Sequence, residues 1–304
     1  MLTQPTHKTI AIVMATYNGE FYIAEQVHSL LQQTYPISEI IIVDDASTDN
    51  TFTKLQLLQA NSSHVTLLQN PTNLGITKTF EKAISLCKSD YIAICDQDDV
   101  WEHHKIATLI NAFGSEDAIY SNSLLVNNKN ESLGIKFDSL LNMQSYYTGL
   151  PFLVNNCVPG HTILMKTAFI QKILPIPSNI MYDRWIGYCA AASNGLAYIN
   201  QTLVRYRQHA NNAIGTHKST KAKVAKQDLY TLKKAELETM ATAPITSVVT
   251  QNALQEMITL FHKKWSLQRS FFFFKHINTI LVIKKKPMYR KYLYCIKMFF
   301  KPNY

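Results

Sequence analysis

The sequence predicts an α/β protein built on a doubly wound, mostly parallel sheet, and two observations support this fold class. Four short, β-branched apolar runs occupy residues 8–14, 39–43, 65–68 and 91–95. Continuous apolar runs of this length are typical of strands buried on both faces of a parallel sheet. Segments with a helical pattern separate the runs, and strands that alternate with helices indicate a sheet covered on both sides.

Each segment between two runs has the spacing of an amphipathic helix. Residues 21–33 and 77–87 repeat apolar side chains every three or four positions. Residues 50–59 follow Ser47 and Asp49, whose short polar side chains can cap the N-terminus of a helix. The first hundred residues therefore predict the order βαβαβαβ. Further along, the runs 163–165 and 203–205 predict two more strands, and a helix is expected from residue 181 to about residue 193.

Composition fits a folded protein of about two domains. The chain has 304 residues, of which 47% are hydrophobic and 17% charged, and this excludes a disordered chain. Five scattered cysteines without a CxxC spacing disfavour a disulfide framework or a structural zinc site and fit a reducing compartment. The N-terminus has no apolar signal core, and no window reaches the roughly 18 unbroken apolar residues of a membrane span. We therefore expect a cytoplasmic protein.

Charge is distributed unevenly along the chain. The residues before 216 carry 13 Lys and Arg and 17 Asp and Glu, whereas residues 216–304 carry 17 and 4. We therefore expect an acidic body, residues 1–215, and a basic, mainly helical extension, residues 216–304. Within the extension, 219–239 and 254–265 predict helices, and aromatic residues at 271–274 lie among lysines. The extension is either a helical subdomain with a solvated basic face or a surface for an anionic membrane, which suits it better than nucleic acid because it is rich in Phe.

Acidic side chains follow two of the predicted strands. Asp44 and Asp45 come directly after the second apolar run, and Asp96, Asp98 and Asp99 come directly after the fourth. Ligands of doubly wound sheets bind at the carboxyl ends of the strands, where these carboxylates would repel one another without a cation. Oxygen ligands indicate Mg²⁺ or Mn²⁺, which usually complete their coordination with substrate phosphates. For either cluster alone, a helix cap is the alternative.

Three motifs at these strand ends follow one another in a specific order. They are MATYNG at 14–19, IVDDASTD at 42–49 and DQDDVW at 96–101, with NLG at 73–75 before the third predicted helix. Together they resemble the family 2 glycosyltransferases of the GT-A fold, over about residues 8–210. The DQDDxW form is similar to bacterial cell-surface polysaccharide transferases, including rhamnosyltransferases.

The resemblance implies a nucleotide-sugar half, residues 1–120, and an acceptor half, residues 121–215. It implies that the side chains that contact the nucleotide sugar are those of Thr16, Tyr17, Asp44, Asp45, Asp96, Arg205 and Arg207. It also implies a Mn²⁺ or Mg²⁺ ion that bridges the diphosphate and stabilises its departure. The implied metal ligands are Asp98, Asp96 and His209.

The acceptor side needs a general base, because a sugar hydroxyl is a poor nucleophile at neutral pH. The resemblance assigns this role to Asp183, although Tyr182 stands where relatives often carry an acidic residue or His. A helix N-terminal Asp that interacts with the helix dipole is the structural alternative. Acceptor contacts are expected for Gly160, His161 and Trp185, and for His161 the equally open alternative is a core or surface histidine. For the two arginines the alternative to diphosphate binding is ordinary surface charge.

The expected activity is inverting, metal-dependent transfer of a sugar from a UDP- or dTDP-sugar to a saccharide or lipid-linked saccharide acceptor. The resemblance points to bacterial surface polysaccharide synthesis, such as that of lipopolysaccharide or capsule, at the inner face of the cytoplasmic membrane and without a nucleic-acid partner. The alternatives are a non-catalytic sugar- or nucleic-acid-binding protein, a nucleotidyltransferase and a phosphorylatable signalling domain. A nucleotidyltransferase would normally show an early glycine-rich phosphate loop, which this sequence lacks, and a signalling domain is about half as long.

Overall fold

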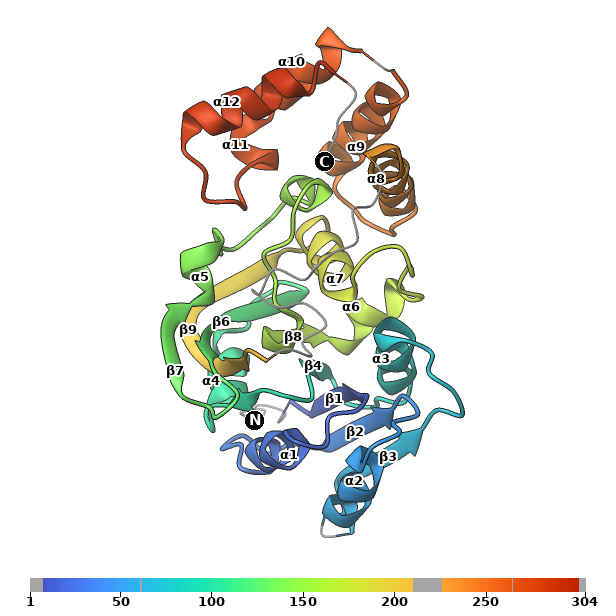
Figure 1. The fold of residues 1–304 in the computed structure, drawn as a ribbon, viewed down its shortest axis with the longest axis vertical. Coiled ribbons are helices and arrows are strands. Elements are labelled where there is room, and N and C mark those ends of the chain that lie inside the picture. Colours follow the sequence, from blue (N-terminus) through green and yellow to red (C-terminus); the bar gives the residue numbers. More distant parts are fainter. Residues whose placement is uncertain (1–7, 61, 210–225, 264, 301–304) are drawn as a thin grey trace, which may run out of the picture.

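The computed structural model describes residues 8–60, 62–209, 226–263 and 265–300, which include a nine-stranded mixed sheet flanked by helices (Figure 1). The strands follow the order β3-β2-β1-β4-β8-β6-β9-β5, and β7 pairs with β6 beside this path. The four predicted strands of the first half are β1 (Ile10–Thr16), β2 (Glu39–Asp44), β3 (Val65–Gln69) and β4 (Tyr91–Cys95). They pair in parallel, as expected.

Strand β1 shows why these runs contain no polar position. Ala11 and Val13 belong to a core cluster that includes side chains of α3 (Ile76–Ser85). Ile10 and Ile12 belong to a second cluster, which includes side chains of α1 (Ile23–Leu31) and α2 (Thr51–Gln59). Successive strand residues point to opposite faces, so a strand covered on both sides needs apolar side chains throughout. The prediction of a doubly wound sheet is confirmed.

After β4 the chain completes the sheet with parallel and antiparallel pairs. The elements are β5 (Val100–Trp101), α4 (Lys105–Ala112), β6 (Ala118–Val126), β7 (Ser132–Lys136), α5 (Phe137–Leu140), the 3₁₀ turns η1 (Leu150–Leu153) and η2 (Gly160–Thr162), β8 (Ile163–Lys166), α6 (Thr167–Lys172), α7 (Tyr182–Ala191) and β9 (Leu196–Arg207). β8 runs antiparallel to β4 and β6, whereas β6 and β9 are parallel. The end of β9 pairs with β5 and so returns the chain to the loop after β4.

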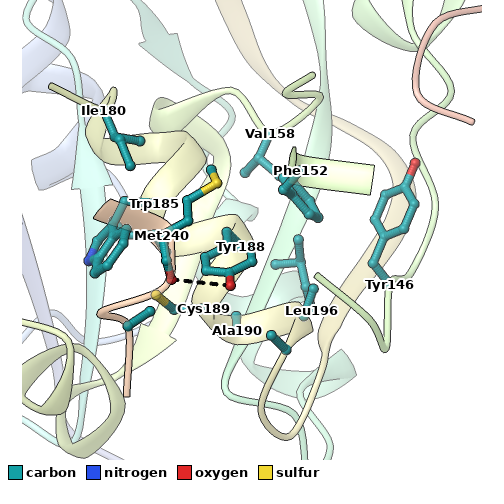
Figure 2. Close-up of a cluster of buried hydrophobic side chains, with 14 of the residues drawn as sticks. Tyr146, Phe152, Val158, Ile180, Trp185, Tyr188, Cys189, Ala190, Leu196 and Met240 are labelled. Atoms are coloured by element: carbon teal, nitrogen blue, oxygen red, sulfur yellow. Dashed lines mark hydrogen bonds between the residues drawn. The ribbon is translucent and has the colours of Figure 1, made fainter. Parts of the chain in front are cut away.

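The extension forms a helical group at one end of the molecule, beyond α7 (Figure 1). Its helices are α8 (Lys226–Met240), α9 (Val248–Phe261), α10 (Leu267–Lys275), α11 (Ile277–Ile280) and α12 (Met288–Lys297). Figure 2 shows one junction with the body, where the Tyr188 hydroxyl of α7 donates a hydrogen bond to the Met240 carbonyl of α8 at 3.3 Å. Body and extension share one buried cluster. The expected boundary at residue 215 lies outside the described residues, and the division into two parts stays a prediction.

Two further expectations concern the whole chain. All five cysteines are buried free thiols, as expected for a chain without a disulfide framework. Among the helices of the described ranges, none combines the length and the apolar character that crossing a membrane requires.

Candidate functional site

The loops that follow β1 and β4 line a cavity of about 640 Å³. Its walls comprise Tyr17, Asn18, Gly19, Phe21, Tyr22, Gln97, Asn128 and His209. The last two residues come from the turn after β6 and from the end of β9. The cavity therefore lies at the carboxyl ends of the strands, where ligands bind in a doubly wound sheet.

Asp44 at the end of β2 organises the loop beside this cavity. Its carboxylate is completely buried, at 0% exposure, and accepts hydrogen bonds from the Thr16 hydroxyl at 3.0 Å and the Ser47 backbone N–H at 2.9 Å. Gln69 donates a further bond at 3.1 Å. Thr16 itself is also buried. Both residues therefore stabilise the loops after β1 and β2, and their direct contact with a nucleotide stays a prediction.

Asp45 connects the second motif to the NLG turn. Its carboxylate accepts hydrogen bonds from the backbone N–H groups of Leu74 and Gly75 and from the Asn70 amide, each at 2.8 Å. Burial raises the pKa of Asp45, but these hydrogen bonds outweigh it and hold the pKa below its usual value. Gly75 has a φ of 83°, which glycine adopts without strain. The turn before α3 is thus built around an ionised Asp45.

Gln97, the second residue of DQDD, fixes the loop after β1. Its amide accepts a hydrogen bond from the Tyr17 N–H at 2.8 Å and donates one to the Tyr17 carbonyl at 3.0 Å. A Cβ atom at Gly19 would overlap with this amide, so a larger residue there would displace the Gln97 side chain. The Tyr17 side chain remains 44% exposed at the cavity. The first and third motifs therefore form one wall.

Asp98 and His209 meet beside the cavity. The Asp98 Oδ2 and His209 Nε2 atoms are 2.9 Å apart, and the His209 ring lies against Tyr22 with 4.8 Å between ring centroids. Carboxylate and imidazole are ligands that Mn²⁺ accepts, and the carboxylate also suits Mg²⁺. Two of the three expected metal ligands are therefore neighbours, and their chemistry fits such an ion.

Asp96 lies between this pair and a more deeply buried polar cluster. Donor atoms of Asp96, Asp99 and His161 lie within 4.8 Å of one another. Asp99 Oδ2 and His161 Nε2 are buried without a hydrogen-bond partner. Burial raises the pKa of Asp99 well above its usual value, and the charges of Asp98 and Asp96 add to the effect. This second set could also hold a cation, but Asp99 and His161 are almost completely buried, whereas His209 lines the cavity.

The two arginines predicted to bind a diphosphate have protein partners. Arg207 is 1% exposed and donates to the carbonyls of Asp98 at 2.8 Å and Asn128 at 2.9 Å. It also pairs with Glu25 at 2.6 Å. Arg205 pairs with Glu102 at 3.2 Å. These contacts make Arg207 a clamp on the backbone of the DQDD loop, and direct binding of a diphosphate by either arginine stays a prediction.

Asp183, the expected base, lies in the first turn of α7. The side chain is half-buried, and its Oδ1 accepts a hydrogen bond from the Arg184 N–H at 2.6 Å. Burial raises the pKa of Asp183 to about 7, and the negative charge of Asp96 contributes to the increase. The Asp183 carboxylate is therefore near enough to Asp96 of the DQDD loop to be affected by its charge. A helix N-terminal position and a general base are compatible roles for this residue.

Three residues expected at the acceptor lie inside the protein. Trp185 is 2% exposed, and its indole N–H donates to the Ile173 carbonyl at 3.0 Å. His161 is also 2% exposed and stacks on Tyr206 with 4.5 Å between ring centroids. Gly160 is buried beneath Tyr182, and a Cβ atom there would overlap with the Tyr182 hydroxyl. The absence of a side chain at Gly160 makes room for the Tyr182 ring, and acceptor contacts of these three residues stay predictions.

Sequence reasoning assigned no role to Gln97 or Lys105, and it treated Tyr182 only as a departure from the family pattern. The Tyr182 hydroxyl donates a hydrogen bond to Asp96 Oδ1 at 3.1 Å. Lys105 is fully buried, with its Nζ 3.0 Å from the centroid of the Trp101 ring and 2.6 Å from the His161 carbonyl. The sequence signal that could have identified Gln97 and Lys105 is weak. Lys105 begins the mostly apolar segment KIATLI, and Gln97 is the second residue of DQDD.

Comparison with known proteins agrees with this geometry. The family model described as Glycosyl transferase family 2 matches residues 11–174. The chain is 31% identical over 225 residues to the dTDP-rhamnosyl transferase RfbG of Shigella flexneri. The matched region covers 69% of this chain and 76% of that protein. It is 31% identical over 121 residues to the UDP-Glc:alpha-D-GlcNAc-diphosphoundecaprenol beta-1,3-glucosyltransferase WfgD of Escherichia coli, covering 39% of this chain and 47% of that protein.

A solved structure shows the same fold. S. aureus TarS 1–349, determined in complex with UDP-GlcNAc, superposes with a TM-score of 0.60 at 18% identity, covering 96% of this chain and 81% of that chain. The fold, the three motifs at the strand ends and the family match all agree. The chain therefore belongs to glycosyl transferase family 2 and is a glycosyltransferase with the GT-A fold.

Proposed function

We propose that this glycosyltransferase transfers a sugar, with inversion and with the help of a divalent metal ion, from a UDP- or dTDP-sugar to a hydroxyl group of a saccharide or lipid-linked saccharide. The observation that supports the proposal most strongly is the Asp98–His209 pair, 2.9 Å apart, beside a cavity of about 640 Å³. The fold places this cavity where a nucleotide is expected.

The donor proposal combines the cavity with the relatives. Tyr17 and Phe21 line the cavity and are 44% and 81% exposed, so both rings are available to stack on a flat base. RfbG is named a dTDP-rhamnosyl transferase, and TarS was solved with UDP-GlcNAc. We therefore propose UDP or dTDP as the nucleotide.

The metal proposal depends on side chains that the protein holds in place. Asp98 and His209, with Asp96, would hold Mn²⁺ or Mg²⁺, which when bound stabilises negative charge on the departing nucleoside diphosphate. Arg207 donates to the Asp98 carbonyl at 2.8 Å and its backbone N–H donates to Asp99 at 3.0 Å. The DQDD loop is therefore held from the β9 side.

Asp183 would remove the proton from the acceptor hydroxyl as that oxygen attacks the anomeric carbon. Burial raises the pKa of Asp183 to about 7, and a base works best when its pKa lies near the working pH. A single displacement of this kind inverts the configuration and needs no covalent nucleophile. The acceptor proposal follows the printed name of WfgD, whose acceptor is a diphosphoundecaprenol-linked sugar. We place the enzyme in bacterial surface polysaccharide synthesis, at the inner face of the cytoplasmic membrane.

A panel of UDP- and dTDP-sugars with a saccharide acceptor and Mn²⁺ tests the proposal. We expect acceptor-dependent release of UDP or dTDP, loss of turnover on chelation, and a product anomer opposite to that of the donor by NMR. Asp98→Asn should lose turnover, whereas the control Asp138→Asn, which replaces a carboxylate on α5 (Phe137–Leu140), should keep it. Retention of configuration, or turnover that chelation leaves unchanged, would overturn the mechanism.

A further inference from the structure

The end of the chain has an extreme charge composition. Residues 257–304 contain eleven Lys and Arg and no Asp or Glu. The structure describes most of this segment as α9 to α12, with α10 and α12 side by side at the end of the molecule away from β1 to β3 (Figure 1). Both α12 and α10 carry apolar side chains that are exposed to solvent.

Helix α12 has an apolar face on its outer side. Of its ten residues, Cys295 is the buried one. The exposed apolar side chains are Met288, Tyr289, Tyr292, Leu293 and Ile296, each 41% to 58% exposed. Spacings of three and four residues align Tyr289, Tyr292, Leu293 and Ile296 along one side of the helix, and Met288 lies at the edge nearer Cys295. An apolar stripe of this kind has no stabilising role in a helix that simply faces water.

The same surface continues onto α10. The rings of Phe274 and Tyr292 stack with 6.1 Å between centroids and join the two helices. Leu267 and Phe271 extend the surface along α10 and are 75% and 71% exposed. Phe272 and Phe273 point the other way and are buried. The four phenylalanines at 271–274 thus serve both as core and as surface.

Basic side chains border this α10–α12 surface. Lys284, Lys285 and Lys286 precede α12 and are all exposed, and Arg290 and Lys297 lie along one edge of its apolar face. Within the described residues, these five cations have no carboxylate partner within ion-pair distance. The surface therefore combines exposed apolar and aromatic side chains with positive charge that nothing in the described structure neutralises.

We propose that the α10–α12 surface docks on the anionic face of a lipid bilayer. Aromatic and aliphatic side chains would enter the headgroup boundary, while the lysines and Arg290 contact lipid phosphates. A second copy of this chain is a poorer occupant, because it would bring like charges together. Nucleic acid would leave Leu293 and Ile296 unburied. The inference stands apart from the donor and the metal, and it rests on the proposed function only in that docking would keep the enzyme on the membrane that holds a lipid-linked acceptor.

Flotation of the full-length protein with vesicles tests this proposal. We expect binding to phosphatidylcholine vesicles that contain phosphatidylglycerol, weak binding to phosphatidylcholine alone, and release by salt. Replacing Lys284, Lys285 and Lys286 by Gln should weaken partitioning about a hundredfold, at about 1 kcal/mol for each charge. Leu293→Ser with Ile296→Ser should weaken it about tenfold or more.

Matched controls separate docking from damage to the fold. Val249→Ser removes a side chain that is 67% exposed on α9, outside the surface, and should bind vesicles as wild type does. Lys129, Lys136 and Lys172, which are exposed on the body, give the matched triple Gln control. Unchanged melting temperatures and nucleotide binding in the surface variants show that failure to float is independent of the donor site.

Four outcomes would overturn the proposal. The first two are failure to float with anionic vesicles and a loss of vesicle binding in the control variants equal to that in the surface variants. The third is a dimer, seen by light scattering, that Leu293→Ser with Ile296→Ser dissociates. The fourth is salt-sensitive DNA binding that only the Lys variants weaken. The third would reassign the surface to self-association, and the fourth to nucleic acid.

Discussion

Tyr182 connects the start of α7 to the DQDD loop. Its hydroxyl donates to Asp96 Oδ1 at 3.1 Å, and burial raises the pKa of Tyr182, which keeps the hydroxyl protonated as a donor. The contact exists because Gly160 has no side chain at the point where the hydroxyl lies. A residue that looked like a departure from the family pattern thus acquires a position beside a predicted ligand.

Removing this hydrogen bond should reduce catalysis without unfolding the protein. We expect Tyr182→Phe to lower kcat/KM about fivefold, since a buried hydrogen bond contributes about 1 kcal/mol. Gly160→Ala should have a larger effect and lower the melting temperature, because its Cβ displaces the tyrosine ring. Tyr198→Phe, which loses a hydroxyl contact with Asn200 at 3.2 Å, is the matched control. Wild-type kinetics in Tyr182→Phe would show that the contact is dispensable.

Asp183→Asn tests the assignment of the base. We expect turnover to fall by about 10² to 10⁴, the usual contribution of a general base, while nucleotide binding persists. Isothermal titration with UDP or dTDP and steady-state rates measure the two effects separately. Equal loss of binding and turnover would make Asp183 a structural residue of the α7 N-terminus.

The raised pKa of Asp183 has consequences for both activity and stability. The carboxylate is ionised above its folded-state pKa of about 7, so turnover should rise with pH through that value. The folded protein disfavours the ionised form of Asp183, whose pKa in the unfolded chain is about 4. The free energy of unfolding should therefore fall as pH rises from about 4 toward 7, by at most about 1.4 kcal/mol per pH unit. Asp183→Asn should lack this loss, and denaturant unfolding across the window measures the difference. Parallel curves for the two proteins would contradict the raised pKa.

At the level of elements, Arg184 anchors the start of α7. It donates to the carbonyls of Phe152 and Leu153, each at 2.9 Å, and pairs with Glu236 of α8 at 2.7 Å. Lys233 also contacts Glu236, at 3.0 Å. Burial raises the pKa of Glu236, but the charges of Lys233 and Arg184 outweigh this and lower it. The extension therefore helps to hold the helix that carries the proposed base.

Breaking this pair should destabilise the whole molecule. Glu236→Gln removes the carboxylate that pairs with Arg184 and with the buried Lys233, and should lower the free energy of unfolding by about 1–2 kcal/mol. The control is Glu238→Gln on the same helix, which breaks an exposed pair with Lys234 at 3.5 Å and should cost less than about 0.5 kcal/mol. Urea unfolding compares the two variants. Equal losses in the free energy of unfolding would mean that the pair between α7 and α8 stabilises the protein no more than an exposed ion pair does.

The sequence predicted strands best where both faces of the sheet are covered. β1, β2 and β4 read as unbroken apolar runs for this reason, whereas β6 (AIYSNSLLV) was overlooked. Its Ser121, Asn122 and Ser123 are fully buried but polar, and the Asn122 Oδ1 accepts the backbone N–H of Ser123 at 2.9 Å. Polar residues in the middle of a buried strand hide it from any pattern of hydrophobicity.

For the site, too, the sequence predicts what depends on local motifs but not what depends on packing between distant elements. The acidic residues at strand ends follow from motif and topology, and Asp98 and His209 do meet, although 111 positions separate them. The direction in which Arg207 and Trp185 point does not follow, because it depends on backbone carbonyls and core contacts from distant elements. Charge and aromatic character identify such residues as important but cannot distinguish a ligand contact from an internal clamp.

For the whole molecule, the central claim is a metal-dependent nucleotide site at the carboxyl ends of β1 and β4. The most direct measurement is the melting temperature with UDP, dTDP, GDP or CMP, each with Mn²⁺ or with a chelator, for wild type, Asp98→Ala and the control Asp138→Ala. A ligand at about a hundred times its Kd stabilises the folded state by about 2.7 kcal/mol. We predict a rise with UDP or dTDP that needs Mn²⁺, persists in Asp138→Ala and disappears in Asp98→Ala. No shift with any nucleotide, or a shift that survives both chelation and Asp98→Ala, would contradict the account.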